Sequence, residues 1–272
     1  MSATTVAKLR RDVAAVRERL APTRAPLGAV DVAARAGLTP DPWQRDLLLS
    51  DARQLVLLCG RQSGKSTITA VLAAHQAAFV PASLVLLLSP SLRQSSELFR
   101  KVRDVLAALG GAAPPAVEES ALRLEFGNGS RVVCLPGKEA TIRGFSAPAL
   151  VVEDEASRVP DDLYQAVRPM LATSGGRLIL LSTPWGRRGH FFETWERGGP
   201  GWHRVKVTAE QVPRIPAAFL ASERAAIPDH VYRSEYEVEF VETDDQFFRD
   251  ADVDAAVSTN VFPLFLEVPR VA

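Results

Sequence analysis

The segment that most constrains the fold of this chain is Gly-Arg-Gln-Ser-Gly-Lys-Ser-Thr, at residues 60–67. It follows the short apolar run Gln54–Leu58. Its last two residues begin the stretch Ser66–Phe79, where apolar residues recur at helical spacing. A strand, a glycine-bearing loop and a helix in this order form a phosphate-binding loop, because the free N–H groups at the start of the helix attract phosphate charge. The segment therefore predicts a nucleotide-binding α/β fold.

Several residues of this loop have a predicted role of their own. Lys65 would reach the β- and γ-phosphate oxygens of ATP, and the Ser66 hydroxyl would hold Mg²⁺. Cys59 stands where the usual pattern has its first glycine, so the loop is a variant in which Gly60 is displaced by one residue. The predicted nucleotide contacts are Gly60, Arg61, Gln62, Ser63, Gly64, Lys65, Ser66 and Thr67.

The rest of the chain fits a largely parallel sheet. Continuous apolar runs at Leu84–Leu88, Leu150–Val152 and Leu178–Leu181 alternate with segments of helical spacing. Buried strands separated by helices are typical of α/β proteins. Two short runs around Gly127-Asn128-Gly129 also predict a β-hairpin. Before the phosphate loop we expect a proline-punctuated loop that leads to a short helix beginning at Pro42.

An acidic triplet follows one of these strands. Glu153-Asp154-Glu155 comes directly after Leu150–Val152. Asp154 is placed to bind Mg²⁺, and Glu155 is placed to polarise the attacking water. The alternative is a solvated acidic turn, and Glu153 complicates the register because it leaves only a short apolar run before the acids.

Four more side chains are candidates for the site. Arg61 could stabilise the γ-phosphate in the transition state, unless it is simply a surface arginine. Arg143 is a second candidate that could act on a neighbouring subunit, with a structural salt bridge as the alternative. Thr183, within Ser182-Thr183-Pro184 at the end of a strand, could sense the γ-phosphate. Gln44 could read the adenine edge with its amide, although its position after Pro-Trp is also compatible with chance.

Composition excludes several classes of protein. The 32 basic residues equal the 32 acidic residues, which argues against coating DNA or membranes by bulk charge. Charge is unevenly distributed, since the N-terminal segment is basic and the segment after Asp229 is acidic. The two cysteines lie in separate apolar runs, so reduced thiols are the simpler interpretation. No apolar run approaches the ~18 residues of a membrane span, and we expect no membrane association.

Taken together, these patterns resemble the ATPase domain of the large terminase subunit of tailed phages. The resemblance covers roughly residues 41–242 and depends on Pro-Trp-Gln, Arg-Gln-Ser-Gly-Lys-Ser, Ile-Arg-Gly, Val-Val-Glu-Asp-Glu-Ala and Ser-Thr-Pro-Trp-Gly in this order. It implies a P-loop NTPase of the RecA-like ASCE type, in which ATP hydrolysis pumps double-stranded DNA into a procapsid. By this similarity Gln44 contacts adenine, Asp154 the metal and Glu155 the water, and Ser182-Thr183-Pro184 couples hydrolysis to motion.

The resemblance also implies partners and a location. We expect a homo-oligomeric ring that binds double-stranded DNA, the portal protein and the small terminase subunit. The ring would work in the cytoplasm of the infected bacterium and transiently at the portal vertex of the procapsid. Arg143 is similar in position to an arginine proposed to act across subunits in related enzymes.

We expect four parts along the chain. These are a basic helix with a proline-rich lead-in at 1–40, the ATPase core at 41–207, a helical linker or lid at 208–245, and a tail at 246–272. The tail is where the nuclease domain of this family would begin. Asp250, Asp252 and Asp254 resemble a solvated face more than a metal cluster, so we expect no nuclease activity from this chain.

Two other functions remain open. A helicase-like, DNA-dependent ATPase would share the loop, the acidic strand and the coupling tripeptide, but it normally has a second lobe, for which the chain after Trp202 is short. A nucleotide-binding assembly protein without turnover would need neither Glu155 nor Arg61.

Overall fold

A single eight-stranded sheet forms the centre of the molecule. The computed structural model describes residues 27–137, 142, 144–241 and 256. The strands are β1 (Gln54–Cys59), β2 (Leu84–Ser89), β3 (Ala116–Glu119), β4 (Arg123–Phe126), β5 (Arg131–Pro136), β6 (Leu150–Asp154), β7 (Arg177–Ser182) and β8 (His203–Val207). Their order across the sheet is β3-β4-β5-β2-β6-β7-β1-β8.

The predicted strand directions are confirmed. From β5 to β8 neighbouring strands run parallel, whereas β3 and β4 form an antiparallel extension at one edge. β7 lies between β1 and β6, so one strand separates the phosphate-loop strand from the acidic strand. Because parallel strands end at the same edge of a sheet, the carboxyl ends of these three strands lie together. Leu58 of β1 is level with Ser182 of β7, and Asp154 of β6 is level with Leu181.

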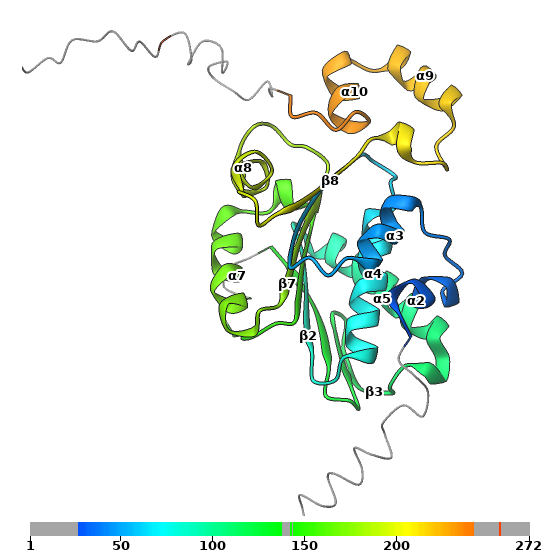
Figure 1. Cartoon of the computed structure of the whole chain (residues 1–272), viewed down its shortest axis with the longest axis vertical. Helices are drawn as coiled ribbons and strands as arrows, with labels where there is room; N and C mark the ends of the chain where they lie inside the picture. Colours follow the sequence, from blue (N-terminus) through cyan, green and yellow to red (C-terminus); the bar gives the residue numbers. More distant parts are fainter. Residues whose placement is uncertain (1–26, 138–141, 143, 242–255, 257–272) are drawn as a thin grey trace, which may run out of the picture.

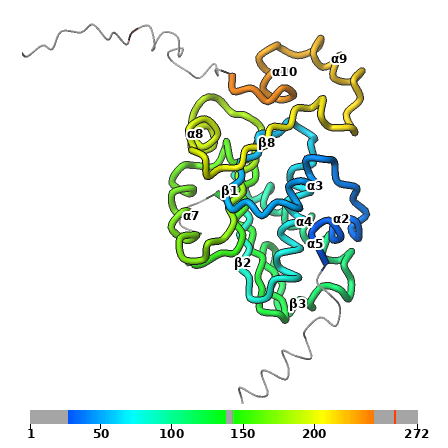
Figure 2. The backbone as a smooth tube through the Cα atoms, in the orientation of Figure 1, coloured from blue at the N-terminus to red at the C-terminus, as the bar shows by residue number. Residues whose placement is uncertain are grey.

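Helices cover both faces of the sheet. The longer helices are α2 (Ala29–Arg35), α3 (Pro42–Leu49), α4 (Lys65–Phe79), α5 (Leu92–Leu109), α7 (Asp161–Ser174), α8 (Gly189–Arg197), α9 (Ala217–Ala226) and α10 (Asp229–Glu235). Figure 1 shows α2 to α5 on one face and α7 and α8 on the other, with α9 and α10 beyond the end of β8. The tube in Figure 2 shows the same three groups.

The side chains of the central strands fill two cores, one on each face. Val152 of β6 packs in the cluster that includes α4 and α5, whereas Val151 packs in the cluster with α7 and α8. This alternation explains why β6 reads as a continuous apolar run, since both of its faces are covered. Among the described residues, no helix is both long and apolar enough to span a bilayer.

Two elements differ from the expectations. The lead-in loop contains helix α2, whose Val32 and Ala33 are fully buried against the core. A seven-residue helix is unstable alone, so its packing and not its local sequence decides its formation. The edge strand β3 was also missed, because all four of its residues are exposed and it lacks an apolar pattern. The predicted basic helix at the N-terminus and the acidic tail after 241 lie outside the described residues.

Candidate nucleotide-binding site

The phosphate loop lies between the end of β1 and the start of α4. The Gly60 N–H donates to the Val207 carbonyl at 2.9 Å, which fixes the beginning of the loop to β8. Gly64 precedes the first turn of α4 with φ of 87°, a conformation that favours glycine. A Cβ atom at Gly64 would lie 2.7 Å from the amide nitrogen of Gln44. The loop therefore requires glycine here, and the free N–H groups at the start of α4 remain available to an anion.

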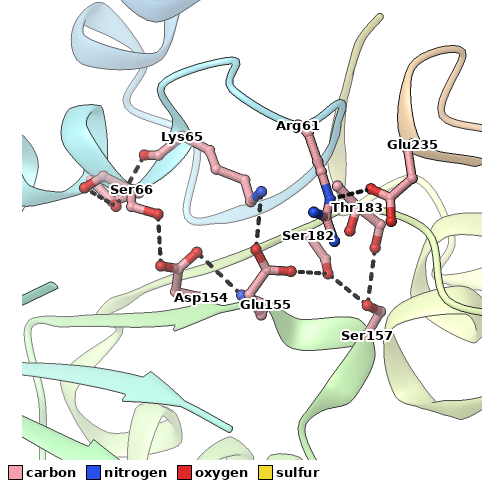
Figure 3. Close-up of polar contacts among 10 residues, drawn as sticks. Arg61, Lys65, Ser66, Asp154, Glu155, Ser157, Ser182, Thr183 and Glu235 are labelled. Atoms are coloured by element: carbon pink, nitrogen blue, oxygen red, sulfur yellow. Dashed lines mark hydrogen bonds and ion pairs between the residues drawn. The ribbon is translucent and has the colours of Figure 1, made fainter. Parts of the chain in front are cut away.

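The metal-binding side of the site joins α4 to β6. The Ser66 hydroxyl donates to Asp154 Oδ2 at 2.8 Å, as Figure 3 shows. Burial raises the pKa of the Asp154 carboxyl above its usual value and the Glu155 charge raises it further, while Lys65 and the Ser66 hydroxyl oppose the shift. A hydroxyl beside a buried carboxylate is a hard oxygen pair of the kind that Mg²⁺ accepts.

The chemistry of this donor set fits magnesium. Mg²⁺ is usually held by one or two carboxylates together with substrate phosphates and waters, not by an all-protein cage. The described part of the chain contains no cluster of three or more His, Cys, Asp or Glu side chains suited to a metal. Asp250, Asp252 and Asp254, which the sequence placed on a solvated face, lie outside the described residues.

Glu155 has a strained backbone and two polar partners. Its φ of 55° and ψ of 43° are left-handed values that are uncommon for a residue other than glycine. The Glu155 Oε1 atom lies 3.0 Å from Lys65 Nζ, and the Ser182 hydroxyl donates to Oε2 at 3.4 Å. Backbone strain of this kind costs about 1–3 kcal/mol and clusters at functional sites. The turn thus presents the Glu155 carboxylate to the phosphate loop and to the end of β7 at once.

Ser182-Thr183-Pro184, the predicted coupling tripeptide, is contacted by Ser157, which the sequence did not single out. The Ser157 hydroxyl lies 2.6 Å from the Ser182 hydroxyl and donates to the Thr183 carbonyl at 2.9 Å. Figure 3 shows the resulting chain of contacts from Lys65 through Glu155 and Ser182 to Ser157. Thr183 is buried beside it. No recognised motif includes Ser157. Its position two residues after Glu155 is the one sequence feature that relates it to the site.

Arg61 projects from the loop toward α10. Its Nε atom lies 2.7 Å from Glu235 Oε2, and its backbone N–H donates to the Glu235 carbonyl at 3.0 Å. The side chain is 63% exposed. The structure therefore places Arg61, the predicted γ-phosphate ligand, in the phosphate loop but pairs its side chain with Glu235 of α10.

Gln44 supports the loop from α3. Its Oε1 atom accepts from the Asp41 N–H at 2.9 Å, and its Nε2 atom donates to the Ser63 carbonyl at 3.1 Å. The amide that was expected to read adenine is thus largely engaged, and one Nε2 hydrogen remains beyond these two bonds. Its position beside a cavity of about 570 Å³ over the loop keeps it next to the candidate nucleotide.

Arg214 completes this cavity, and sequence analysis did not single it out. Its guanidinium contacts both carboxylate oxygens of Asp41, at 2.6 and 2.7 Å, and donates to the Ser63 carbonyl at 3.0 Å. Arg214 lies in the segment after β8, so no spacing relates it to the loop. A larger hollow of about 800 Å³ lies beside α5 and β4, away from these groups.

The predicted site residues thus separate into two sets. Gln44, the phosphate loop, Asp154, Glu155 and Thr183 converge at the carboxyl edge of the sheet. Arg143 lies outside the described residues, and its predicted role stays untested.

Comparison with known proteins places the chain in a family. Residues 56–254 match the family model described as "Terminase large subunit, T4likevirus-type, N-terminal". The chain belongs to this family. As a terminase chain it is 26% identical over 251 residues to the terminase large subunit of Thermus phage G20c, covering 80% of this chain and 52% of that protein. It is 24% identical over 241 residues to a probable large subunit of Enterobacteria phage P7, covering 79% of this chain and 49% of that protein.

Solved terminase structures show the same fold. The large terminase ATPase domain of Thermus phage P74-26 superposes with a TM-score of 0.68 at 24% identity, covering 77% of this chain and 97% of that one. The large terminase of a second thermophilic bacteriophage, in complex with ADP, gives 0.62 at 12% identity, covering 74% of this chain and 54% of that one. The fold is therefore the RecA-like ASCE fold of large terminase ATPase domains. The chain spans about half the length of the curated relatives it matches.

Proposed function

We propose that this chain is the ATP-hydrolysing motor domain of a terminase that translocates double-stranded DNA into a procapsid. The single observation that carries the proposal is the contact chain Lys65–Glu155–Ser182, with bond distances of 3.0 and 3.4 Å. It joins a phosphate-binding cation, a candidate general base and a candidate coupling hydroxyl. A site that only bound nucleotide would need the first of these alone.

Nucleotide binding is supported by the loop and by the fold relatives. ATP would place its phosphates on the N-terminal amides of α4, with Lys65 at the outer phosphates. Arg214 and Gln44 would lie beside the rest of the nucleotide, in the cavity over the loop. The large terminase of the second thermophilic bacteriophage has been solved with ADP and with ATP-gamma-S. A chain with the same fold and a phosphate loop of its own is expected to take the same class of ligand.

The hydrolytic step requires a base and charge stabilisation. Glu155 would orient and deprotonate the attacking water, while Lys65 and Arg61 would stabilise negative charge on the γ-phosphoryl oxygens. Ser66 and Asp154 would hold Mg²⁺, which when bound neutralises phosphate charge. Arg61 would have to exchange its Glu235 partner for the phosphate in order to contribute.

The remaining proposals concern the whole assembly. We propose a ring of subunits that binds double-stranded DNA and works with the portal protein and the small terminase subunit, with Arg143 completing the site of a neighbour. We further propose that 41–207 is the catalytic core and that 208–245, which includes α9 and α10, is a lid. The family membership supports these roles, and the Arg61–Glu235 pair supports a lid that senses the loop.

Glu155→Gln tests the proposal. The amide keeps the size of the side chain but cannot accept the water proton, so ATP turnover should fall about 100-fold or more while the affinity for a fluorescent ATP analogue stays within twofold. Purified chain with Mg²⁺, ATP and duplex DNA provides the assay. Glu118→Gln on the exposed strand β3 is the matched control and should keep wild-type turnover. Turnover in Glu155→Gln equal to wild type would remove Glu155 from its role and the proposal with it.

A further inference from the structure

The carboxylate that interrupts the apolar strand before the catalytic acids lies on the opposite face of the sheet from the phosphate loop. Glu153 follows Val151 by two residues, so it shares the face that packs against α7 and α8. It is fully buried, with 0% relative exposure. At this position an apolar residue would continue the strand without any desolvation cost, so a buried carboxylate needs a specific partner.

That partner is His190, in the first turn of α8. Its Nε2 atom lies 2.9 Å from Glu153 Oε2, and its Nδ1 atom lies 3.1 Å from Asp161 Oδ1 at the start of α7. The backbone N–H of His190 also donates to this Asp161 oxygen at 2.8 Å. Tyr164 stacks on the imidazole with ring centroids 4.5 Å apart. The ring is therefore held in position and in plane by contacts from two other elements, β6 and α7.

Both ring nitrogens face carboxylate oxygens, and only an imidazolium can donate to both. Burial lowers the pKa of His190, but the hydrogen bonds and charges of Glu153 and Asp161 outweigh burial and raise the pKa above its usual value. The cluster is thus a buried ion pair extended by a second carboxylate, which is more exposed.

This cluster connects the end of β6, which carries the proposed catalytic acids, with the start of α8, which follows the proposed coupling tripeptide. Glu153 is followed directly by Asp154 and Glu155, so the direction of its side chain helps to fix the end of β6. His190 comes after the coupling tripeptide and the loop that continues from it, at the point where α8 begins. The His190–Glu153 contact therefore connects α8 directly to the strand that carries the proposed catalytic carboxylates.

We propose that His190 is a positioning residue that couples the occupancy of the phosphate loop to α8 through Glu153. The inference rests on the proposed ATPase function. It assigns a role to a buried charge that the hydrolytic step does not use. A purely structural role would be met as well by an apolar pair, because replacing a buried ion pair with hydrophobic residues is often neutral or stabilising.

Three variants separate positioning from packing. His190→Leu leaves Glu153 buried without its cation. Glu153→Leu combined with His190→Leu removes both charges and refills the space with apolar side chains. His203→Gln, on the exposed face of β8, is the matched control. Each is compared with wild type in denaturant unfolding, in affinity for a fluorescent ATP analogue and in kcat for ATP.

We expect the double variant to unfold at a denaturant midpoint within experimental error of wild type, or higher, yet to have a kcat at least about 10-fold lower, with nucleotide affinity within twofold. Losses of this size are typical when groups that orient a catalytic ligand are removed. His190→Leu should lower kcat at least as much. His203→Gln should leave the denaturant midpoint, the nucleotide affinity and kcat unchanged. Recovery of both stability and kcat in the double variant would show that the cluster only packs, and would overturn the proposal.

A second measurement does not depend on turnover. Amide hydrogen exchange is followed over residues 185–194 with and without a non-hydrolysable ATP analogue and Mg²⁺. In wild type and His203→Gln the analogue should slow exchange at the start of α8, whereas in the double variant it should leave exchange unchanged. An equal response in the double variant would overturn the coupling. If instead wild type binds the analogue and responds but does not hydrolyse ATP, the proposed function fails and the coupling stands.

Discussion

Arg214 shows how a single side chain can define a pocket that its sequence neighbours do not suggest. Three hydrogen bonds connect its guanidinium to Asp41 and to the Ser63 carbonyl, so it joins the segment after β8 to α3 and to the phosphate loop. The Asp41 carboxylate and the Ser63 carbonyl accept these bonds. The Arg214 side chain is half exposed and lines the cavity over the loop. It is therefore well placed to order the loop before nucleotide binds.

Arg214→Ala is expected to weaken ATP binding about 10-fold. Hydrogen bonds to charged groups contribute about 1.5–3 kcal/mol, and their loss frees the Ser63 carbonyl and the Asp41 carboxylate that shape the pocket. Titration with a fluorescent ATP analogue measures the effect. Arg224→Ala, on α9 and equally exposed, is the control. An affinity for Arg214→Ala equal to that of Arg224→Ala would contradict this role.

The three acids at the end of β6 illustrate the limit of prediction for single residues. Asp154 and Glu155 were placed correctly at the end of a strand from their position after an apolar run. Glu153 was not understood, because the sequence does not tell which face of β6 it occupies or that His190 lies opposite. A contact between residues 37 positions apart depends on how α8 crosses the sheet.

At the scale of elements, local pattern predicted those helices and strands whose burial is regular. α5 shows this well: its apolar residues recur every three to four positions, and Leu98 is 1% exposed in the core whereas Leu92 is 59% exposed. α2 and β3 escaped prediction for the opposite reason. Neither has a strong periodic pattern, and each forms because a neighbouring element offers it a surface or a hydrogen-bonding edge.

Leu98→Ala should destabilise the fold by about 2–5 kcal/mol, since it removes buried methyl groups and leaves a cavity under α5. Leu92→Ala, in the same helix but exposed, should change the free energy of unfolding by less than about 0.5 kcal/mol. Chemical denaturation of both variants gives the comparison. Equal losses would mean that α5 does not pack as described.

For the whole molecule, the site at the carboxyl edge of the sheet depends on three strands that are remote in sequence. β1, β7 and β6 lie side by side, and their ends bring the phosphate loop, Ser182-Thr183-Pro184 and the acids Asp154 and Glu155 to one place. The proposed ring adds a further level, because Arg143 would complete the site of a neighbouring subunit.

If Arg143 acts on a neighbour, ATP turnover per subunit should rise with protein concentration as rings assemble. Mixing Arg143→Ala with Glu155→Ala subunits should restore part of the activity, since some interfaces then combine an intact arginine with an intact glutamate. Turnover is measured across mixing ratios at fixed total protein, with each variant alone as the reference. Additive, near-zero rates at every ratio would place Arg143 in its own site or outside catalysis.

The order of residues along the chain was enough to predict the fold class, the phosphate loop and the acidic end of β6. These predictions depend on neighbouring residues alone. An apolar run predicts a buried strand, and the glycine-bearing loop or the acids that follow it therefore lie at the end of that strand. The packing of the elements, by contrast, brings Arg214 to the cavity over the phosphate loop, Ser157 to Ser182 and Thr183, and His190 to Glu153. Each of these contacts joins side chains from separate elements, and their distance is set by the packing of helices on the sheet, which no spacing along the chain encodes.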